Sequence, residues 1–169
     1  GVTPDIVLPD FYNLVDLGER ENDYPLESTT IDPVPFNQNA YRIADLGKLK
    51  SNSEARVKAD PTFQKIDENA KRLKRQKEHT QYPLQASKYR EWNKKQDEEA
   101  AQYEKMFQPI EGFMVDNLLA DMSQIKSDTG RIARNDDWLK DKKKDIQLYE
   151  TFNIMQDMIR MDAVAAGKQ

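Results

Sequence analysis

The sequence contains no cysteine, and this absence excludes disulfide bonds and thiolate chemistry. It holds one histidine and no set of zinc ligands at the spacing that metal sites require. No apolar run approaches the roughly 20 residues that span a membrane, and the first residues lack the basic and then apolar pattern of a signal peptide. We therefore expect no metal, no cofactor and no transmembrane segment in this chain.

An excess of charge of one sign is also lacking. The 169 residues include 26 basic and 30 acidic side chains, which gives a formal net charge of -4 and no overall attraction to nucleic acid or anionic lipid. Charged residues make up 33% of the chain and hydrophobic residues 37%, with a mean hydropathy of -0.92. Little apolar material is left for a thick interior, so we expect an elongated or partner-docked shape.

Prolines are present, but they are concentrated at one end. Five of the eight lie in the first 36 residues, where each removes an amide donor and restrains the preceding residue to extended geometry. We predict an extended segment at 1–36, with one short strand at 6–8, followed by a helical domain at 37–169. The five prolines are Pro4, Pro9, Pro25, Pro33 and Pro35.

Helical periodicity is strongest between Asp60 and Phe107, where apolar residues recur at steps of three and four. Asp60 and Pro61 form a helix-start signal, and Pro83 is expected to open a second helix. The spacing predicts two amphipathic helices in an antiparallel hairpin. Its expected buried residues are Phe63, Ile66, Ala70 and Leu73 in the first helix and, in the second, an aromatic stripe of Tyr89, Trp92 and Tyr103.

The segments around this hairpin give weaker signals. Gly47 is expected to interrupt a short helix, which restarts at Ser51. Pro109 and Gly112 predict a turn, and the apolar positions across 115–125 predict a helix that packs under the hairpin. The polar run 127–137 is interpreted as a loop. Asp145 is expected to cap a final helix that frays after Met161, with four residues facing inward: Leu148, Phe152, Met155 and Ile159.

Several groups of polar residues invite functional interpretations. The basic cluster at 71–77 could contact phosphates, but charge runs are usually solvated faces and the net charge is acidic, so we expect no nucleic-acid partner. The acids at 97–99 point to different helix faces, and those at 128–137 do not have the spacing of a calcium loop. His79 lacks an orienting partner in the sequence. We therefore assign no catalytic residue and no metal ligand.

Four blocks of sequence carry a resemblance. The opening nonapeptide at 1–9 reads GVTPDIVLP, and it resembles the segment by which C-terminal processing (tail-specific) serine proteases leave their catalytic core. The stretches at 15–32, 53–76 and 145–159 are similar to successive later blocks of the same family, in the same order. They read VDLGERENDYPLESTTID, SEARVKADPTFQKIDENAKRLKRQ and DIQLYETFNIMQDMI.

The resemblance implies a C-terminal, largely helical domain of a bacterial serine endopeptidase of the periplasm or cell envelope. In the family, a serine activated by a lysine cleaves the substrate; that pair would lie upstream, so this chain alone is expected to have no peptidase activity. The implied partners are the protease core, substrates with exposed C-terminal tails and an adaptor protein. Four apolar residues are expected to contact the protease core: Val2, Ile6, Leu8 and Phe11.

The sequence thus predicts a mainly α fold, a helical hairpin or bundle of four to five helices with an extended, proline-rich N-terminal segment. Its expected role is scaffolding of the protease core and help with substrate or adaptor docking. A free-standing helical adaptor is the alternative, because charged helical hairpins also serve as interaction modules. The N-terminal sequence favours the first interpretation, since the stretch at 1–9 is typical of the middle of a longer chain.

Overall fold

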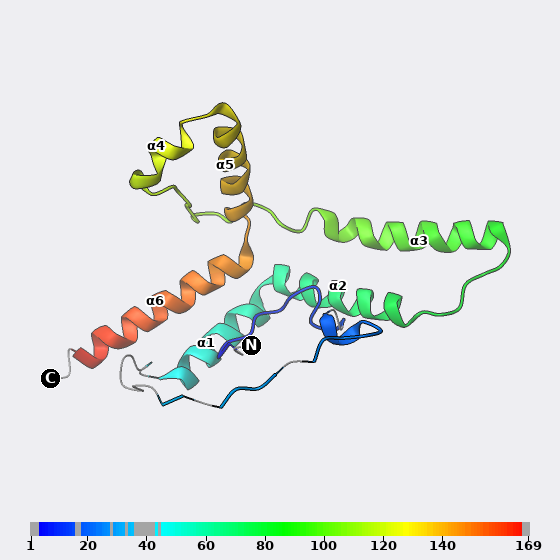
Figure 1. The fold of residues 1–169 in the computed structure, drawn as a ribbon, viewed down its shortest axis with the longest axis horizontal. Helices are drawn as coiled ribbons and strands as arrows, with labels where there is room; N and C mark the ends of the chain where they lie inside the picture. The colour runs from blue at the N-terminus through cyan, green and yellow to red at the C-terminus, as the bar shows by residue number, and fades with distance from the viewer. Residues whose placement is uncertain are drawn as a thin grey trace.

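The structure is a computed structural model that describes residues 4–15, 18–27, 29–32, 34–35, 43 and 45–166. The described residues form six α-helices and two short 3-10 helices, η1 (Glu19–Glu21) and η2 (Leu119–Asp121), without a strand (Figure 1). The mainly α class is confirmed, while the short strand expected at 6–8 is absent. The α-helices are α1 (Leu46–Ala59), α2 (Pro61–Glu78), α3 (Ala86–Glu104), α4 (Met122–Ile125), α5 (Thr129–Lys142) and α6 (Ile146–Ala166).

Helix α1 begins earlier than the sequence suggests. The side chain of Asp45 accepts a hydrogen bond of 2.8 Å from the amide of Lys48 and caps the helix. Gly47 lies in the first turn, so the predicted interruption at Gly47 and restart at Ser51 are wrong. A glycine within a helix costs only about 1 kcal/mol, which a good cap of similar worth offsets.

Asp60 joins α1 to α2 as the only residue between them. Its backbone is extended, with φ -84° and ψ 123°, and its carboxylate accepts the amide of Thr62 at 2.7 Å. Pro61 occupies the first helical position, where its missing amide donor is not needed. The predicted helix start at Asp60 and Pro61 is confirmed.

Helices α1 and α6 lie side by side and are joined by charged residues (Figure 1). Arg56 donates to both carboxylate oxygens of Glu150, from Nη2 at 2.8 Å and from Nε at 3.0 Å, and to Asp157 at 2.7 Å. The Glu150 side chain is 3% exposed and that of Asp157 is 11% exposed. Hydrogen bonds from Arg56 lower the pKa of Asp157, and those to Glu150 raise the pKa of Arg56. We call these three residues the Arg56 network.

The apolar core is small and lies where the start of α2, the segment after α3 and the start of α6 meet. Phe63 and Ile66 face this core, as their spacing predicts. They pack with two residues from distant parts of the sequence, Met106 and Ile146. The core thus holds the foot of α2 against the beginning of α6.

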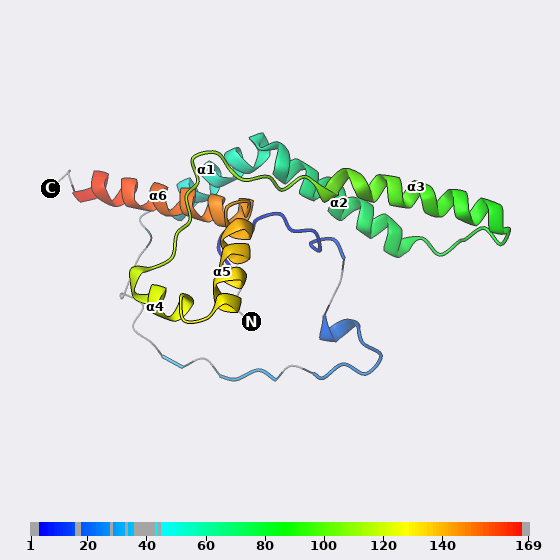
Figure 2. The ribbon, with the colours of Figure 1, turned by 90° about the horizontal axis from the view of Figure 1, so that it is seen from above.

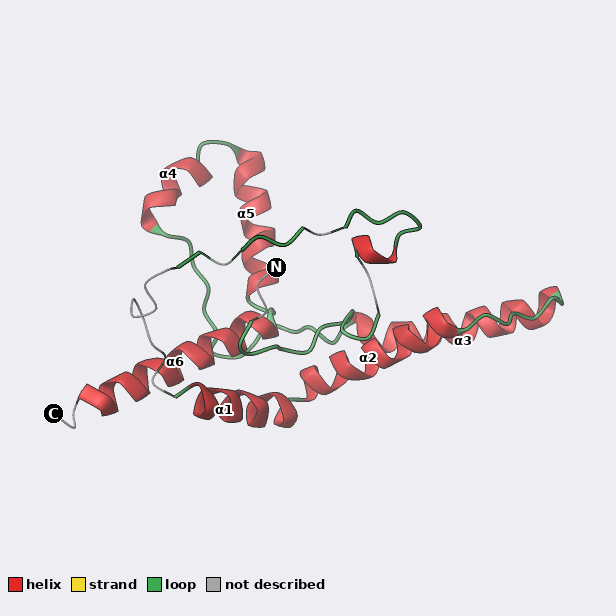
Figure 3. Cartoon of the chain, turned by 60° about the horizontal axis from the view of Figure 1, so that its bottom comes forward, coloured by secondary structure: helices red, strands yellow, loops and turns green. Residues whose placement is uncertain are grey.

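Helices α2 and α3 run antiparallel and project from the body as a hairpin (Figures 1 and 3). The register is visible in two contacts: the His79 ring lies 5.5 Å from the Trp92 ring, and the Arg72 guanidinium lies 5.8 Å from the Tyr103 ring. The antiparallel hairpin is confirmed, although α3 begins at Ala86 rather than at Pro83.

The aromatic stripe of α3 is not a core, contrary to the prediction. None of the residues of α3 is buried, and Tyr89 is 44% exposed. The reason is that the stripe of α2 that faces α3 is polar, so no apolar interior exists there for the rings of Tyr89, Trp92 and Tyr103 to enter. That polar stripe consists of Arg72, Arg75, Gln76 and His79.

The chain turns after the hairpin as predicted, because the amide of Phe113 donates to the carbonyl of Ile110 at 3.1 Å. Gly112 takes a φ of 75°, a conformation that other residues rarely adopt. The helix expected across 115–125 is wrong: only η2 and the single turn α4 form there. Leu118 is 72% exposed, so this apolar side chain is not covered by another described part of the chain.

Helix α5 occupies the region that the sequence suggests is a loop. Asp128 caps it by accepting the amide of Arg131 at 3.1 Å, and Gly130 lies in its first turn. The polar run 127–137 is therefore the solvated surface of a capped helix. Its acidic residues do not gather into a cation site, since the described part of the chain contains no cluster of three metal-ligating side chains.

Helix α6 begins as predicted, with Asp145 accepting the amide of Leu148 at 3.0 Å. Its orientation and length differ from the prediction: the residues expected inside face solvent, and the helix continues past Met161 to Ala166. The face that packs against α1 carries Glu150 and Asp157, whose ionic bonds to Arg56 orient the helix. The exposed residues are Leu148, Phe152, Met155 and Ile159.

The molecule exposes far more surface than a compact protein of its size. Its accessible area is 14212 Å², whereas a compact protein of 19.7 kDa exposes about 8,600 Å². Figure 2 shows the cause, since the hairpin, α5 and the N-terminal segment extend in different directions. The elongated shape that the composition predicts is thus observed. Among the described helices, none has the length and apolar character needed to cross a membrane.

Candidate docking surfaces

The N-terminal arm, residues 4–15, is attached to the body of the domain. Leu8 and Phe11 pack against the apolar core, and the Phe11 ring meets the Phe107 ring edge-on at 5.7 Å. The side chain of Gln147 donates a hydrogen bond of 2.9 Å to the carbonyl of Pro9. The arm is therefore held at the beginning of α6 by one polar and two apolar side chains.

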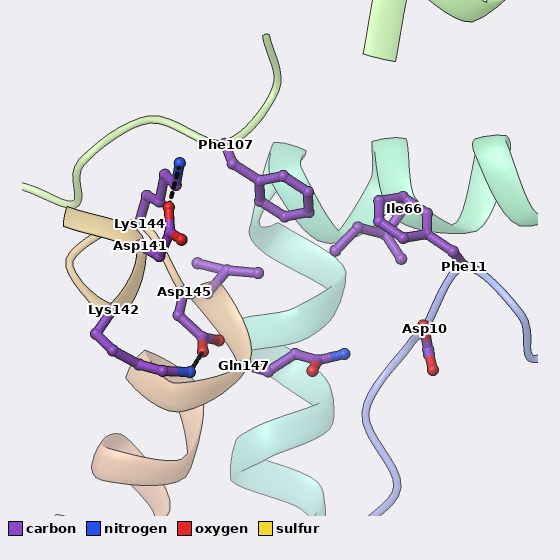
Figure 4. Close-up of a pocket in the computed structure, with 10 residues that line it drawn as sticks. Asp10, Phe11, Ile66, Phe107, Asp141, Lys142, Lys144, Asp145 and Gln147 are labelled. Carbon is purple, nitrogen blue, oxygen red and sulfur yellow. Dashed lines mark hydrogen bonds and ion pairs between the residues drawn. The ribbon is translucent and has the colours of Figure 1, made fainter. Parts of the chain in front are cut away.

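A pocket of about 270 Å³ opens beside the arm (Figure 4). We call it the arm pocket. Its floor is apolar and combines residues that lie far apart in the sequence: Phe11, Ile66, Phe107 and Ile146. Its rim is polar and consists of Asp10, Asp141, Lys142, Lys144, Asp145 and Gln147.

Two lysines and two aspartates of the rim form ion pairs. Lys142 contacts Asp145 at 2.8 Å, and Lys144 contacts Asp141 at 2.8 Å. Burial raises the pKa of Asp145, but hydrogen bonds from Lys142 and the amide of Leu148 outweigh it, so the net pKa is lowered. The Lys144 hydrogen bond likewise lowers the pKa of Asp141. The lowered pKa values favour the ionised forms of both carboxylates, which remain paired with the two lysines.

The outer face of α6 carries a row of exposed apolar side chains, which we call the α6 row: Leu148, Phe152, Met155 and Ile159. Exposure rises along the row from 37% at Leu148 to 67% at Ile159. The row extends for about 16 Å of helix. Phe113 packs beside it, with its ring 6.2 Å from that of Phe152. A continuous exposed apolar strip of this kind is typical of an interaction surface.

The far end of the hairpin carries an aromatic cluster. The Trp92 ring stacks on His79, with 16° between the ring planes, and meets Tyr82 edge-on at 5.1 Å. Tyr89 lies 5.8 Å from Trp92 and completes the cluster. His79 is exposed, as its polar surroundings in the sequence predict.

The basic cluster at 71–77 is largely a solvated helix face. Lys71 pairs with Asp67, and Lys74 lies 3.8 Å from Glu78, both one turn away on the same helix. Such exposed pairs contribute little to stability, and they reduce the positive field that a phosphate backbone would need.

The four residues predicted to dock on a protease core lie in different places. Val2 lies outside the described residues. Ile6 is half-buried, whereas Leu8 and Phe11 pack on the core of this chain. Their role in docking stays a prediction.

The α6 row was missed as a candidate surface, although its periodicity is plain in the sequence. The available signal was the opposite face of the same helix, where Glu150 and Asp157 lie seven residues apart and so point the same way. Two carboxylates on one face match one arginine on a neighbouring helix. Recognising this match would have led to the prediction that the apolar face of α6 points outward.

The comparisons agree with the resemblance in the sequence. The family model described as the C-terminal domain of tail specific protease (DUF3340) matches residues 12–160. This range includes three of the four resembling blocks, and the opening nonapeptide precedes it. Among the curated proteins and the solved structures, none matches the chain. Because the family model covers most of the sequence, the chain belongs to the family of C-terminal domains of tail-specific proteases.

Proposed function

We propose that this chain is the non-catalytic C-terminal domain of a periplasmic or cell-envelope tail-specific serine endopeptidase. It scaffolds the protease core by docking on it with the α6 row, and it helps to position substrates or an adaptor. The catalytic serine and lysine belong to the protease core, so the chain contributes surfaces rather than chemistry.

The α6 row is the observation that carries this proposal. Phe152 and Met155, at the middle of the row, are 46% and 55% exposed on a helix whose other face is bound to α1 through Arg56. Burying one such side chain is worth about 1.5–3 kcal/mol, so the row offers a substantial gain to a partner that covers it. The protease core is the partner we propose, because this domain and the core would be parts of one protein.

The surface area of the chain supports the same conclusion. The excess over a compact protein of equal mass is several thousand Å². Stable interfaces bury about 1,200–2,000 Å² in total, so the chain has ample area for one or more partners. The N-terminal arm, which leads to the beginning of α6, would bring the protease core close to the α6 row.

The test is co-elution of this chain with the separately produced catalytic part of the parent protease in size-exclusion chromatography. The double variant Phe152→Asp/Met155→Asp should abolish co-elution, because two charges would be buried in the interface. The melting temperature of the variant chain should stay close to that of the unchanged chain, because both side chains are exposed. The control is Thr151→Asp, which adds one negative charge to α6 outside the row.

Unchanged co-elution of the double variant would show that the α6 row is not the docking face. Substitution of Ile6 or Leu8 tests the second part of the predicted interface. Because Leu8 also packs on the core of this chain, Leu8→Asp should lower the stability of the chain alone, whereas the α6 variants should not. The two sets of variants therefore separate docking from folding.

The proposed location is tested by fractionating source cells and detecting the protein with an antibody against this chain. A band much larger than 19.7 kDa in the envelope fraction is expected, because the domain would be part of a longer protease. A band at the mass of this chain in the cytosol would favour the free-standing adaptor instead.

A further inference from the structure

A groove of about 200 Å³ lies between α2 and α3 in the hairpin, far from the α6 row. We call it the hairpin groove. Drug-sized ligands occupy pockets of about 300–1,000 Å³, so this groove has room for the end of a chain rather than for a cofactor. Its lining residues are Arg72, Arg75, Gln76, His79, Trp92, Gln96 and Glu99.

The lining is unusual for two packed helices because the facing stripes are polar. On α2 the groove residues recur at steps of three and four, and on α3 Trp92, Gln96 and Glu99 do the same. Each set therefore occupies one face of its helix, and the two faces are turned to each other. Helices normally bury apolar residues where they meet, whereas here all of α3 remains without a buried residue.

The two arginines of the groove have no carboxylate partner among the described residues. Arg75 makes no hydrogen bond or ion pair there. Arg72 donates to two neutral side chains, Asn69 at 2.8 Å and Gln76 at 3.4 Å, and lies over the Tyr103 ring. On the outer surface of the same helix, Lys71 and Lys74 do have carboxylate partners.

The charge of the groove is positive and its far end is aromatic. Arg72 and Arg75 contribute two positive charges against the one negative charge of Glu99, and His79 adds a donor. The cluster around Trp92 fixes the indole ring at the same place, with Tyr82 half exposed beside it. A ligand that fits has a carboxylate for the guanidinium groups, amides for Gln76 and Gln96, and an apolar side chain for the rings.

We infer that the hairpin groove binds the C-terminal end of a polypeptide, with the terminal carboxylate on Arg72 and Arg75 and the last side chain against Trp92. A chain terminus presents these three groups within one residue. The inference rests on the proposed function, since it supplies a tail-binding site on the domain of a protease described as tail specific. The groove would hold a tail outside the protease core.

The test is a fluorescence titration of this chain with a short glycine–serine peptide that ends in leucine. A Trp138→Phe background leaves Trp92 as the only indole. The peptide with a free carboxylate should change the Trp92 emission and saturate, and its C-terminal amide should bind at least about tenfold more weakly, because charge-assisted hydrogen bonds are lost. Equal binding of the amide would overturn the inference, as would no binding at about 1 mM.

Arg75→Gln is the decisive variant, because Arg75 has no partner among the described residues whose loss would disturb the fold. It should weaken peptide binding about tenfold or more. The matched control is Lys94→Gln, which removes a cation from an exposed ion pair on α3 and should leave binding unchanged. Unchanged binding by Arg75→Gln would contradict the assignment.

An amidated peptide with an internal glutamate distinguishes the source of the carboxylate. Binding equal to that of the free terminus would assign the groove to acidic side chains and overturn the terminal assignment. Co-elution of Arg75→Gln with the catalytic part is measured in parallel. The hairpin groove and the α6 row are separate surfaces, so peptide binding tests the groove and co-elution tests the α6 row. Loss of peptide binding with retained co-elution is the result expected for Arg75→Gln.

Discussion

The α1–α6 pair and the α2–α3 hairpin are both pairs of neighbouring helices, yet they are held together in opposite ways. In the first pair, Arg56 of α1 contacts two nearly buried carboxylates of α6. In the second, α3 contributes no buried residue, and the contacts are between aromatic and polar side chains that remain partly exposed. Ion pairs thus join α1 to α6, whereas α2 and α3 face each other with polar residues and leave a groove between them.

The difference shows that the placement of the apolar residues does not follow the usual rule for a small domain. An apolar face of α6 points outward, while the residues that join the helix to α1 are ionic. In an isolated globular domain this arrangement would be costly. In a domain with a partner the arrangement has a use, because the ionic face fixes the internal geometry and leaves the apolar face accessible to that partner.

The largest expected effect is that of Arg56→Met. Removing the arginine leaves Glu150 nearly buried without a cation and leaves Asp157 with only the more distant Arg160, at 3.8 Å. Breaking such a buried pair costs about 3–5 kcal/mol of unfolding free energy. Urea unfolding followed by circular dichroism measures the loss. Lys94→Gln in the hairpin should cost less than about 1 kcal/mol, because its ion pair is exposed. Equal losses would remove the contrast between the two pairs.

The second prediction compares one substitution at the foot of the hairpin with one in the segment that follows the hairpin. Ile66 is 2% exposed in the core, and Ile66→Ala should cost about 2–5 kcal/mol. Leu118→Ala removes the same number of carbon atoms from an exposed position and should change stability by less than about 0.5 kcal/mol. A large loss for Leu118→Ala in the same urea titrations would show that its segment is packed after all.

A third pair of substitutions removes the cap of α2 and adds a cap to α3. Asp60→Ala removes the carboxylate that caps α2 and should cost about 0.5–2 kcal/mol. Helix α3 lacks a side-chain cap at Gln85, so Gln85→Asp should stabilise it by about 1 kcal/mol or less. Hydrogen exchange measured by mass spectrometry should show slower exchange of the α3 amides in the second variant. Unchanged exchange would mean that fraying at this end does not limit α3.

The smallest effect is the pH dependence of a single carboxylate in the Arg56 network. Because Arg56 lowers the pKa of Asp157 below 3.8, its stabilising contribution is present above pH 3.8 and is lost as pH falls through the lower folded-state pKa. The stability difference between the unchanged chain and Arg56→Met should therefore shrink on acidification. Urea midpoints at pH 7 and at pH 3 measure it, and a constant difference would contradict this coupling.

The features that sequence reasoning predicted correctly are local. The caps at Asp60 and Asp145 involve amides within three residues of the carboxylate, so their chemistry is visible in a short window. The inward positions of Phe63 and Ile66 follow from a regular apolar spacing next to a capped start. The same reasoning could have found α5, whose cap Asp128 was assigned to a loop because polar residues dominate its surroundings.

The features that could not be predicted depend on contacts between distant residues. The outward orientation of α6 depends on Arg56, which lies 94 residues before Glu150. The arm pocket combines the N-terminal arm, α2, the segment after α3 and the start of α6, and no local pattern brings these together. The hairpin groove could not be predicted for a related reason. Its lining combines residues of α2 and α3, and the sequence does not show which residues of α3 face the basic residues of α2.

The junction at Asp60 has a mechanical consequence. A single residue connects α1, which the Arg56 network fixes to α6, with an 18-residue helix about 27 Å long. Because the apolar core holds the foot of α2, the helix acts as a lever whose fulcrum lies at its first turns. A rotation of about 5° at the fulcrum displaces the far end of α2 by about 2 Å. Small adjustments at the junction are thereby amplified at the tip of the hairpin.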